Sequence, residues 1–259
     1  RIIQHAISNG KKVLVCVHRM ELLDQMRDHL EKWGVEVGLI LSGFPWDNSL
    51  SVNLAMIPTL HSRVIRRKKD KHPQADLVIF DETHHSISAK TWQDIAALYP
   101  ESFILGVTAT PISKSGKGSG NHFDAMVVGP SICELTQQGH LVPARYFTPT
   151  VPDLNGLKVR AGDYVEEELS ERMDIPKLIG DICENWSRIC PTRKTIVFAT
   201  SVKHSIHIAE AFRSIGIKAE HLDGETTKEE RTKVVDAFKN GDVQVLSYCR
   251  LFSEGFDSP

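Results

Sequence analysis

The 259-residue sequence lacks long hydrophobic runs, cysteine pairs and a marked net charge. No segment approaches the roughly 18 consecutive apolar residues of a membrane-spanning helix. The first residues, RIIQHAISNGKK, also lack the apolar core of a signal peptide. We therefore expect a cytoplasmic protein without a membrane contact. The formal net charge of -2 gives no overall attraction to nucleic acid, so such binding would need local basic groups.

Cysteine usage excludes two further classes of protein. The five cysteines are odd in number and form no C-x-x-C pair, at positions Cys16, Cys133, Cys183, Cys190 and Cys249. This pattern argues against a disulfide framework and against a zinc ribbon. The adjacent His84 and His85 are also poor candidates for zinc ligands, because neighbouring loop residues diverge and no third ligand is evident. We expect reduced thiols.

Short apolar runs alternate with helical patterns in the first half of the chain. The pattern predicts strands at 12–17, 37–41, 77–80 and 103–108, with an opening helix and further helices at 20–34 and 88–98. Because these runs are continuous, we expect strands that are covered on both faces. This is typical of a parallel sheet with crossover helices, in an α/β layout.

The same rhythm resumes after a polar stretch rich in Gly and Pro, at about 112–165, which we interpret as an exit loop and linker. Helices are predicted at 175–188, 204–215 and 228–240, and strands at 195–200, 217–224 and 243–249. We therefore expect two α/β domains in tandem. The first covers residues 1–145, a linker covers 146–174, and a smaller second domain covers 175–259.

Two adjacent carboxylates follow the predicted strand at 77–80. Ligands collect at the carboxyl ends of parallel strands, where Asp81 and Glu82 lie. One carboxylate can hold a hard cation while the other positions a water, as phosphoanhydride hydrolysis requires. The alternative is that the pair only caps the next helix. The following strand ends in hydroxyl residues, Thr108 and Thr110, which favours a shared site at this edge.

Six segments together resemble the superfamily 2 DNA and RNA helicases and translocases, in the family's order and over nearly the whole chain. DETH at 81–84 resembles the DExH box, TATP at 108–111 motif III, and VHRMELLDQ at 17–25 motif Ia. VNLAMIPTL at 52–60 resembles motifs Ib and Ic, IVFATSVKH at 196–204 motif IV, and LDGETTKEER with VLSYCRLFSEGFDSP the approach to motif V and motif V itself. The resemblance implies two RecA-like parallel-sheet domains in tandem, both truncated. Residues 115–143 also resemble the bacterial and phage branch that includes RadD-type proteins.

The resemblance implies a role for each matching residue. Asp81 would hold Mg2+ through water, and Glu82 would activate the water that attacks the γ-phosphate of ATP. His84 would connect this site to the coupling residues Thr108, Ala109 and Thr110. The backbone of a single strand would be contacted by Arg19, Thr59, Ser201, Thr226 and Ser253, and the nucleotide would be faced by Gly255 and Asp257. The implied cofactors are ATP and Mg2+, and the implied partner is single-stranded or branched DNA, or RNA.

Other features depart from the family or imitate a site. A Walker A lysine and a motif VI arginine are missing, so we expect a fragment that is nearly inactive alone. Tyr248 and Arg250 are unusual in motif V. SGKGSG at 115–120 lacks the hydroxyl of a phosphate loop. We interpret the basic run at 63–72 as a solvated helix end, and the four isolated tryptophans as packing residues.

Two functions remain open. The first is an ATP-dependent superfamily 2 helicase or translocase, an ATP hydrolase at full length, acting in DNA repair, recombination or phage replication. The second is a helicase-like module that binds nucleic acid or a partner without hydrolysis, or the motor subunit of a restriction complex. The residues quoted above favour the first function.

Overall fold

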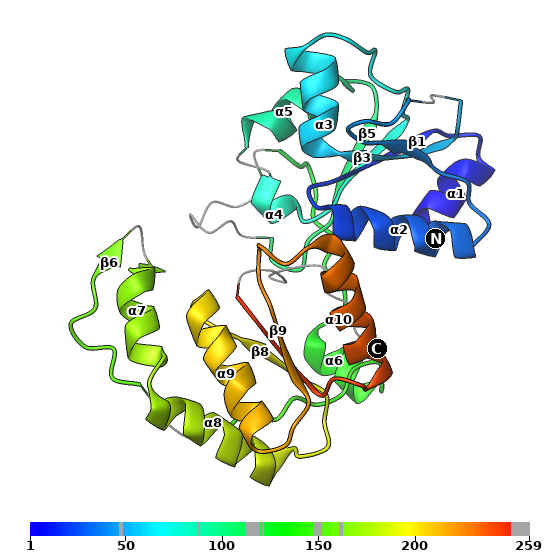
Figure 1. Cartoon of the computed structure of the whole chain (residues 1–259). Coiled ribbons are helices and arrows are strands. Elements are labelled where there is room, and N and C mark those ends of the chain that lie inside the picture. Colours follow the sequence, from blue (N-terminus) through cyan, green and yellow to red (C-terminus); the bar gives the residue numbers. More distant parts are fainter. Residues whose placement is uncertain are drawn as a thin grey trace. The chain divides into compact units, whose positions relative to one another are not determined.

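The computed structural model describes residues 1–46, 49–86, 89–111, 120, 122–147, 152–160 and 163–249. The chain divides into two compact units, Arg1–Ser131 and Ile132–Pro259 (Figure 1), and each unit has its own parallel sheet. Among the described residues, no helix combines the length and the apolar character needed to cross a bilayer. The predicted boundaries at 145 and 175 remain predictions.

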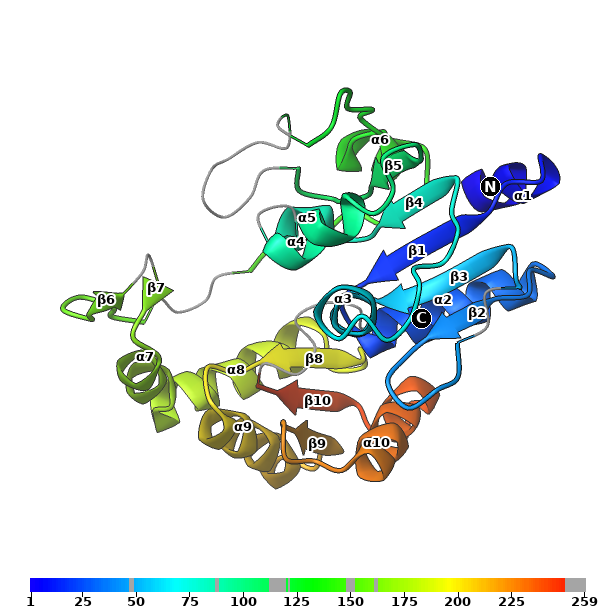
Figure 2. The same cartoon turned by 90° about the horizontal axis from the view of Figure 1, so that it is seen from above.

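The first unit is built on a parallel five-stranded sheet in the order β2-β3-β1-β4-β5. The strands are β1 (Val13–Val17), β2 (Gly38–Ile40), β3 (Val52–Met56), β4 (Leu77–Phe80) and β5 (Phe103–Gly106). Figure 2 shows β1 between β3 and β4, where Val13 pairs with both Val52 and Leu77. The sequence predicted four of these strands and missed β3, which lies inside a segment interpreted only as a motif.

Helices cover both faces of this sheet (Figure 1). They are α1 (Ile2–Ser8), α2 (Met20–Lys32), α3 (Ile57–His61), α4 (Thr83–Ser86) and α5 (Lys90–Ala96), with a π-helical turn η1 (Ser62–Arg66) directly after α3. Residues of α1 and α2 pack on one face, and residues of α3 and α5 pack on the other. The helices predicted at 20–34 and 88–98 are confirmed with shorter bounds.

Strand β1 shows why the apolar runs are continuous. Val13 and Val15 face Leu23 and Leu30 of α2, whereas the alternate residue Cys16 packs in the cluster of Trp92 and Ile95 from α5. All residues of β1 are fully buried, as expected for a strand between two helical layers. Burial raises the pKa of the Cys16 thiol, which keeps it protonated.

The second unit contains a parallel sheet in the order β8-β10-β9. Its strands are β8 (Thr195–Phe198), β9 (Ala219–Leu222) and β10 (Val245–Tyr248), and its helices are α6 (Ile132–Gln137), α7 (Glu166–Met173), α8 (Pro176–Ile189), α9 (Val202–Ser214) and α10 (Lys228–Asn240). Two short strands, β6 (Val159–Arg160) and β7 (Asp163–Tyr164), pair antiparallel. Apolar residues of α8 and α9 fill one cluster, around Trp186 and Phe212, and α10 contributes Phe238 to another.

The predicted α/β class with parallel sheets is confirmed, and some bounds agree closely. Helix α10 begins and ends where the sequence placed it, because Thr227 and Glu230 form a capping box and Gly241 adopts the left-handed conformation at φ 87°. Part of the predicted linker is structured. Ser170 of α7 donates to Ser201 Oγ at 2.6 Å, and Asp174 lies 2.7 Å from His207 Nδ1 of α9.

The tryptophans behave mostly as predicted. Trp92 and Trp186 are buried in the two units, and Trp46 packs partly against the first core. Trp33 differs, because it follows α2 with 56% of its surface exposed. Residues His122 and Phe123 of the predicted exit loop also return to the first core, where both rings contact Trp92 edge-on.

Gly106, the last residue of β5, leaves no space for a side chain. A Cβ atom there would lie 2.5 Å from Phe123 Cζ and 2.8 Å from Thr83 Oγ1. We expect Gly106→Ala to lower the free energy of unfolding by about 1–3 kcal/mol, because the packed neighbours must move. Urea unfolding measures this change. The control is Gly129→Ala, where a Cβ meets nothing within 4 Å; equal losses for both variants would contradict the prediction.

His204 of α9 predicts a pH dependence of stability. Its ring is 2% exposed, Nδ1 lies 3.0 Å from Thr200 Oγ1, and Nε2 has no partner among the described residues. Burial lowers the pKa of His204, against the opposing charge of Asp174. The unfolded state therefore binds more protons, so stability falls as the pH drops below the ordinary histidine pKa of about 6.5. Measured by urea unfolding between pH 8 and about pH 5, the free energy of unfolding should decline less steeply for His204→Gln than for the wild type. Parallel profiles of the two proteins would refute this.

Candidate functional site

The carboxyl edge of the first sheet gathers the residues predicted in that unit. Strands β1, β3, β4 and β5 run parallel and in register, so the residues that follow them leave the same edge. Arg19 lies two residues beyond β1, Thr59 three beyond β3, Asp81 follows β4, and Thr108 lies two beyond β5. The sheet topology therefore brings these four positions to one side of the unit.

The acidic pair forms a tight turn at the end of β4. Asp81 N donates to Cys16 O at 3.1 Å, which extends the pairing of β4 with β1 by one residue. Asp81 Oδ1 then accepts from Glu82 N at 3.0 Å, so Asp81 caps this turn. Glu82 has φ 48°, a left-handed conformation that costs a residue with a side chain roughly 1–3 kcal/mol. Such strain persists only where the surroundings impose it.

Thr83 supplies that constraint, and the sequence did not single it out. Its N–H donates to Val107 O at 3.0 Å, and its hydroxyl lies 2.9 Å from Phe80 O and 3.2 Å from Val107 O. The side chain is 2% exposed. Thr83 therefore attaches the acidic turn to the end of β5, against Gly106. The sequence signal was weak, because a threonine between charged residues reads as a surface position.

His84 joins the acidic turn to the hydroxyl residues after β5. Its Nδ1 lies 2.7 Å from Thr108 Oγ1 and 3.2 Å from Glu82 Oε2. Thr108 Oγ1 accepts from Thr110 N at 3.1 Å and can donate to Thr110 O at 3.2 Å. Ala109 between them is exposed. The structure thus brings together the predicted catalytic and coupling residues of this unit, and their roles remain predictions.

The two predicted backbone contacts of the first unit lie at helix starts. Arg19 is the N-cap residue of α2, with extended backbone angles. Thr59 is half-buried in α3 and lines a pocket beside the basic η1 turn. Both residues are half-buried and follow strands at the carboxyl edge of the sheet, and their contacts with a nucleic-acid backbone remain predictions.

The predicted hydroxyls of the second unit already have partners. Ser201 is the N-cap of α9, where its Oγ accepts from His204 N at 3.1 Å. Thr226 Oγ1 donates to Asp223 Oδ1 at 3.0 Å and accepts from Asp223 N at 3.1 Å. These are the cap and turn roles that hydroxyl residues take without any ligand. A phosphate contact would have to share these hydroxyls.

A polar chain that the sequence did not reveal begins at Asp223. Asp223 Oδ2 lies 3.2 Å from His221 Nε2, His221 Nδ1 lies 2.6 Å from Ser205 Oγ, and Ser205 Oγ lies 2.8 Å from Ser247 Oγ. Burial raises the pKa of Asp223, but hydrogen bonds from His221 and Thr226 bring it below the usual value. Ser205 is fully buried, so this Ser-His-Asp arrangement cannot attack a substrate. It connects the Thr226 turn to β10.

Several predicted positions lie outside the described residues. These are Ser253, Gly255 and Asp257 of motif V, Arg250 before them, and residues 112–119, which contain most of the rejected SGKGSG segment. The predicted roles of the three motif V residues therefore stay predictions.

The acidic turn fits a magnesium ion that is held through water. Within the described part of the chain, no group of three or more His, Cys, Asp and Glu side chains could hold a metal on its own. Mg2+ needs less, because it usually keeps several waters and takes one or two carboxylates plus substrate phosphates. Asp81 uses one carboxylate oxygen for Glu82 N. Its donor set therefore suits such a site.

Comparisons with known proteins identify the relatives of this chain. Residues 1–113 match the family model described as "Type III restriction enzyme, res subunit", and residues 177–259 match "Helicase conserved C-terminal domain". A 51.5 kDa protein of a Lactococcus phage is 32% identical over 98% of this chain and 52% of its own length. A Schizosaccharomyces pombe protein named as a mitochondrial ATP-dependent helicase, irc3, is 28% identical over 97% of this chain and 42% of its own.

The solved structures support the fold. A fragment described as an HsdR subunit of a type I restriction enzyme from Vibrio vulnificus superposes with a TM-score of 0.65, at 18% identity, over 96% of this chain and 45% of that one. The chain spans about half the length of the curated relatives it matches. The tandem RecA-like α/β fold is thereby confirmed, and the matches support a helicase or a restriction-enzyme subunit. The chain belongs to the superfamily 2 helicase-type proteins.

Proposed function

We propose that the full-length protein is an ATP-dependent translocase or helicase that couples ATP hydrolysis to movement on DNA or RNA. The observation that carries this proposal is His84, which lies within hydrogen-bond distance of both Glu82 and Thr108. One imidazole thus contacts both the carboxylate that would accept the proton and the hydroxyl at the end of the next strand. The predicted domains at 1–145 and 175–259, and membership of the RadD-type branch, belong to the same proposal.

The roles of the acidic pair follow from their positions in the turn. Mg2+, when bound with ATP, neutralises charge on the phosphate oxygens. Asp81 would hold it through a water, with the carboxylate oriented by the Glu82 amide. Glu82 would orient the attacking water and accept its proton. The positive φ of Glu82 and the anchoring of Thr83 restrict where this carboxylate can lie.

Coupling would use the contact between His84 and Thr108. A nucleic-acid strand along Arg19 and Thr59 would lie at the same β-strand ends as Thr108. Movement of the nucleic acid would then change the hydrogen bond between Thr108 and His84. Movement along any sequence suits contacts to phosphate, which carry no base information. The role would be in phage replication, DNA repair or recombination, and the origin of one relative in a Lactococcus phage suits the first of these.

A second candidate function is the motor subunit of a restriction complex. It is supported by the family model matched over residues 1–113 and by the similarity to an HsdR subunit. The third candidate function is a nucleic-acid-binding module without hydrolysis. Such a module would not use the strained turn at Glu82. The first two functions share the same chemistry at Glu82, so loss of hydrolysis in a Glu82 variant tests both against the third.

The first prediction for this site concerns Glu82. Glu82→Gln in the full-length protein should lower nucleic-acid-stimulated ATP hydrolysis by about 10²- to 10⁴-fold, because the amide cannot accept the proton. Binding of single-stranded DNA should be kept. The matched control is Glu101→Gln, at an exposed position before β5. Hydrolysis that survives Glu82→Gln at the control's level would rule out Glu82 as the base.

The second prediction concerns Thr108. Thr108→Val removes the hydroxyl that contacts His84 and Thr110 while keeping the side-chain volume. We expect basal ATP hydrolysis to stay within a few-fold, and its stimulation by single-stranded DNA or RNA to fall at least about fivefold. Steady-state hydrolysis with and without nucleic acid measures both, and Thr91→Val, at an exposed position of α5, is the control. Normal stimulation in Thr108→Val would contradict a coupling role.

A further inference from the structure

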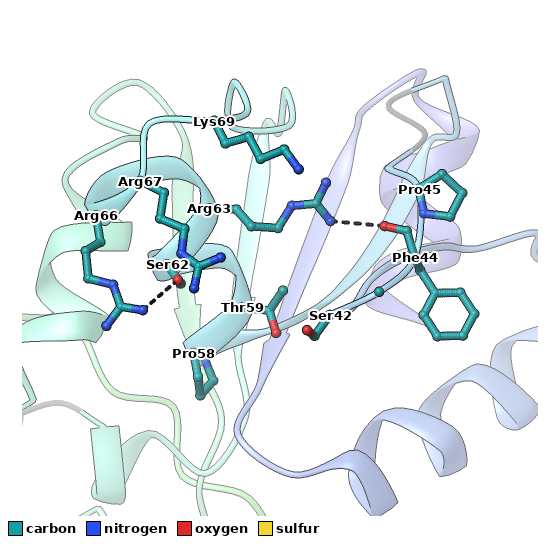
Figure 3. A pocket seen from close by; sticks show the side chains of 11 residues that line it. Ser42, Phe44, Pro45, Pro58, Thr59, Ser62, Arg63, Arg66, Arg67 and Lys69 are labelled. Carbon is teal, nitrogen blue, oxygen red and sulfur yellow. Dashed lines mark hydrogen bonds between the residues drawn. The ribbon is translucent and has the colours of Figure 1, made fainter.

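A pocket of about 610 Å³ lies beside Thr59 at the carboxyl edge of the first sheet. Its walls come from the segment that follows β2, from α3 and from η1. Figure 3 shows Arg66 and Arg67 on one side of this pocket and Phe44 on the other, with Thr59 and Ser42 between them in this view. Neither the acidic turn nor the coupling residues line this pocket, so it is a separate feature of the unit.

Arg63 fixes the geometry of the pocket. Its Nε donates to Asp70 Oδ2 at 2.6 Å, and its Nη1 donates to Phe44 O at 3.1 Å. Its guanidinium carbon lies 5.0 Å from the ring centroid of Trp46, within the range of a cation–π contact. Arg63 therefore ties η1 to the segment that carries Phe44. Its charge is already paired, so it acts as a positioning residue.

Three other cations in the pocket wall remain available for a ligand. Arg66, Arg67 and Lys69 are exposed. Arg66 donates to Ser62 Oγ at 3.1 Å, and neither Arg67 nor Lys69 forms an ion pair with any residue that the structure describes. The π-helical turn, a feature frequent at functional sites, places them around one opening. Unpaired cations beside hydroxyls are suited to phosphate oxygens.

Phe44 adds a second kind of contact. Its side chain is 57% exposed at the pocket, although its backbone is held by Arg63. An exposed aromatic ring on a fixed backbone offers a flat surface for a nucleic-acid base, since every base has a π-face. Cations for phosphates together with an aromatic ring for a base are the combination by which proteins bind single strands without sequence preference.

We propose that this pocket binds a single-stranded nucleic-acid segment, with its phosphates on Arg66, Arg67 and Lys69 and one base stacked on Phe44. The proposal rests on the proposed function, because it extends the strand path from Thr59. It also revises the interpretation of residues 63–72 as a solvated helix end. Of the aromatic residues, the sequence singled out only the tryptophans, as packing residues, so Phe44 in GFPW was missed.

The stacking contact is tested by binding of a fluorescent oligothymidylate to the 259-residue chain, without nucleotide. Phe44→Ala should weaken binding roughly 5- to 150-fold, whereas Phe44→Trp should restore it. An oligonucleotide with abasic sites should bind the wild-type chain and Phe44→Ala equally. Unchanged affinity in Phe44→Ala, or wild-type affinity that does not distinguish abasic from normal strands, would overturn the proposal. Thermal unfolding of each variant checks that the unit is folded.

The phosphate contacts are tested by the salt dependence of the same binding. The double variant Arg67→Ala with Lys69→Ala should reduce the slope of log affinity against log salt by about 1.4, at about 0.7 per phosphate of a single strand. The charge-matched control replaces Lys32 and Lys71, which are exposed and do not line the pocket. Equal slopes in the two double variants would refute the phosphate contacts. If inorganic phosphate displaces the strand more than another salt of equal ionic strength does, and Phe44→Ala leaves binding unchanged, the pocket is a small-anion site. That result would also overturn the proposal.

The binding assay and the hydrolysis assay fail independently. If ATP hydrolysis is absent while the effects at Phe44 and Arg67 hold, the motor function is wrong and the strand site stands. If hydrolysis depends on Glu82 but the Phe44 and Arg67 variants bind the strand normally, the motor function stands and the strand site is wrong.

Discussion

The structure of the candidate site depends on backbone pairing that continues past the ends of two parallel strands, β4 and β5. Asp81 N bonds to Cys16 O, Val107 N to Phe80 O, and Thr83 N to Val107 O. These bonds hold the loops after β4 and β5 in one register, which brings Glu82, His84 and Thr108 within hydrogen-bond distance. Without them the loops would be free to separate, and adjacent carboxylates after a strand would carry no defined chemistry.

This pairing requires residues that local preferences would not select. Gly106 ends a strand, where glycine is unfavourable, because Thr83 and Phe123 occupy the space of a side chain. Thr83 is buried with its hydroxyl bonded to two carbonyls, and Glu82 adopts a left-handed backbone. Each feature makes sense only in the presence of the other two. A strained conformation that the neighbouring structure enforces is a reason to assign a function to the turn.

The sequence predicted features that depend on local pattern. Short apolar runs identified β1, β4 and β10, and the helical pattern identified α10. Features that depend on distant segments were not predictable. Ser205 and Ser247 meet across 42 positions of sequence, and Arg63 reaches back to Phe44. Strand β3 was missed because Asn53, which is buried, interrupts its apolar run.

Under the proposed function, the two units would offer nucleic acid different kinds of contact. The first has exposed cations and a half-buried hydroxyl at Thr59, so its contribution should be largely electrostatic and should weaken with salt. In the second, Thr226 is already bonded to Asp223, and the chain through His221 and Ser205 ends on Ser247 of β10. A phosphate that competes for the Thr226 hydroxyl would disturb a network that reaches the strand leading into motif V. Under the proposed function, the first unit would therefore supply affinity, and the second would be better suited to sense the strand.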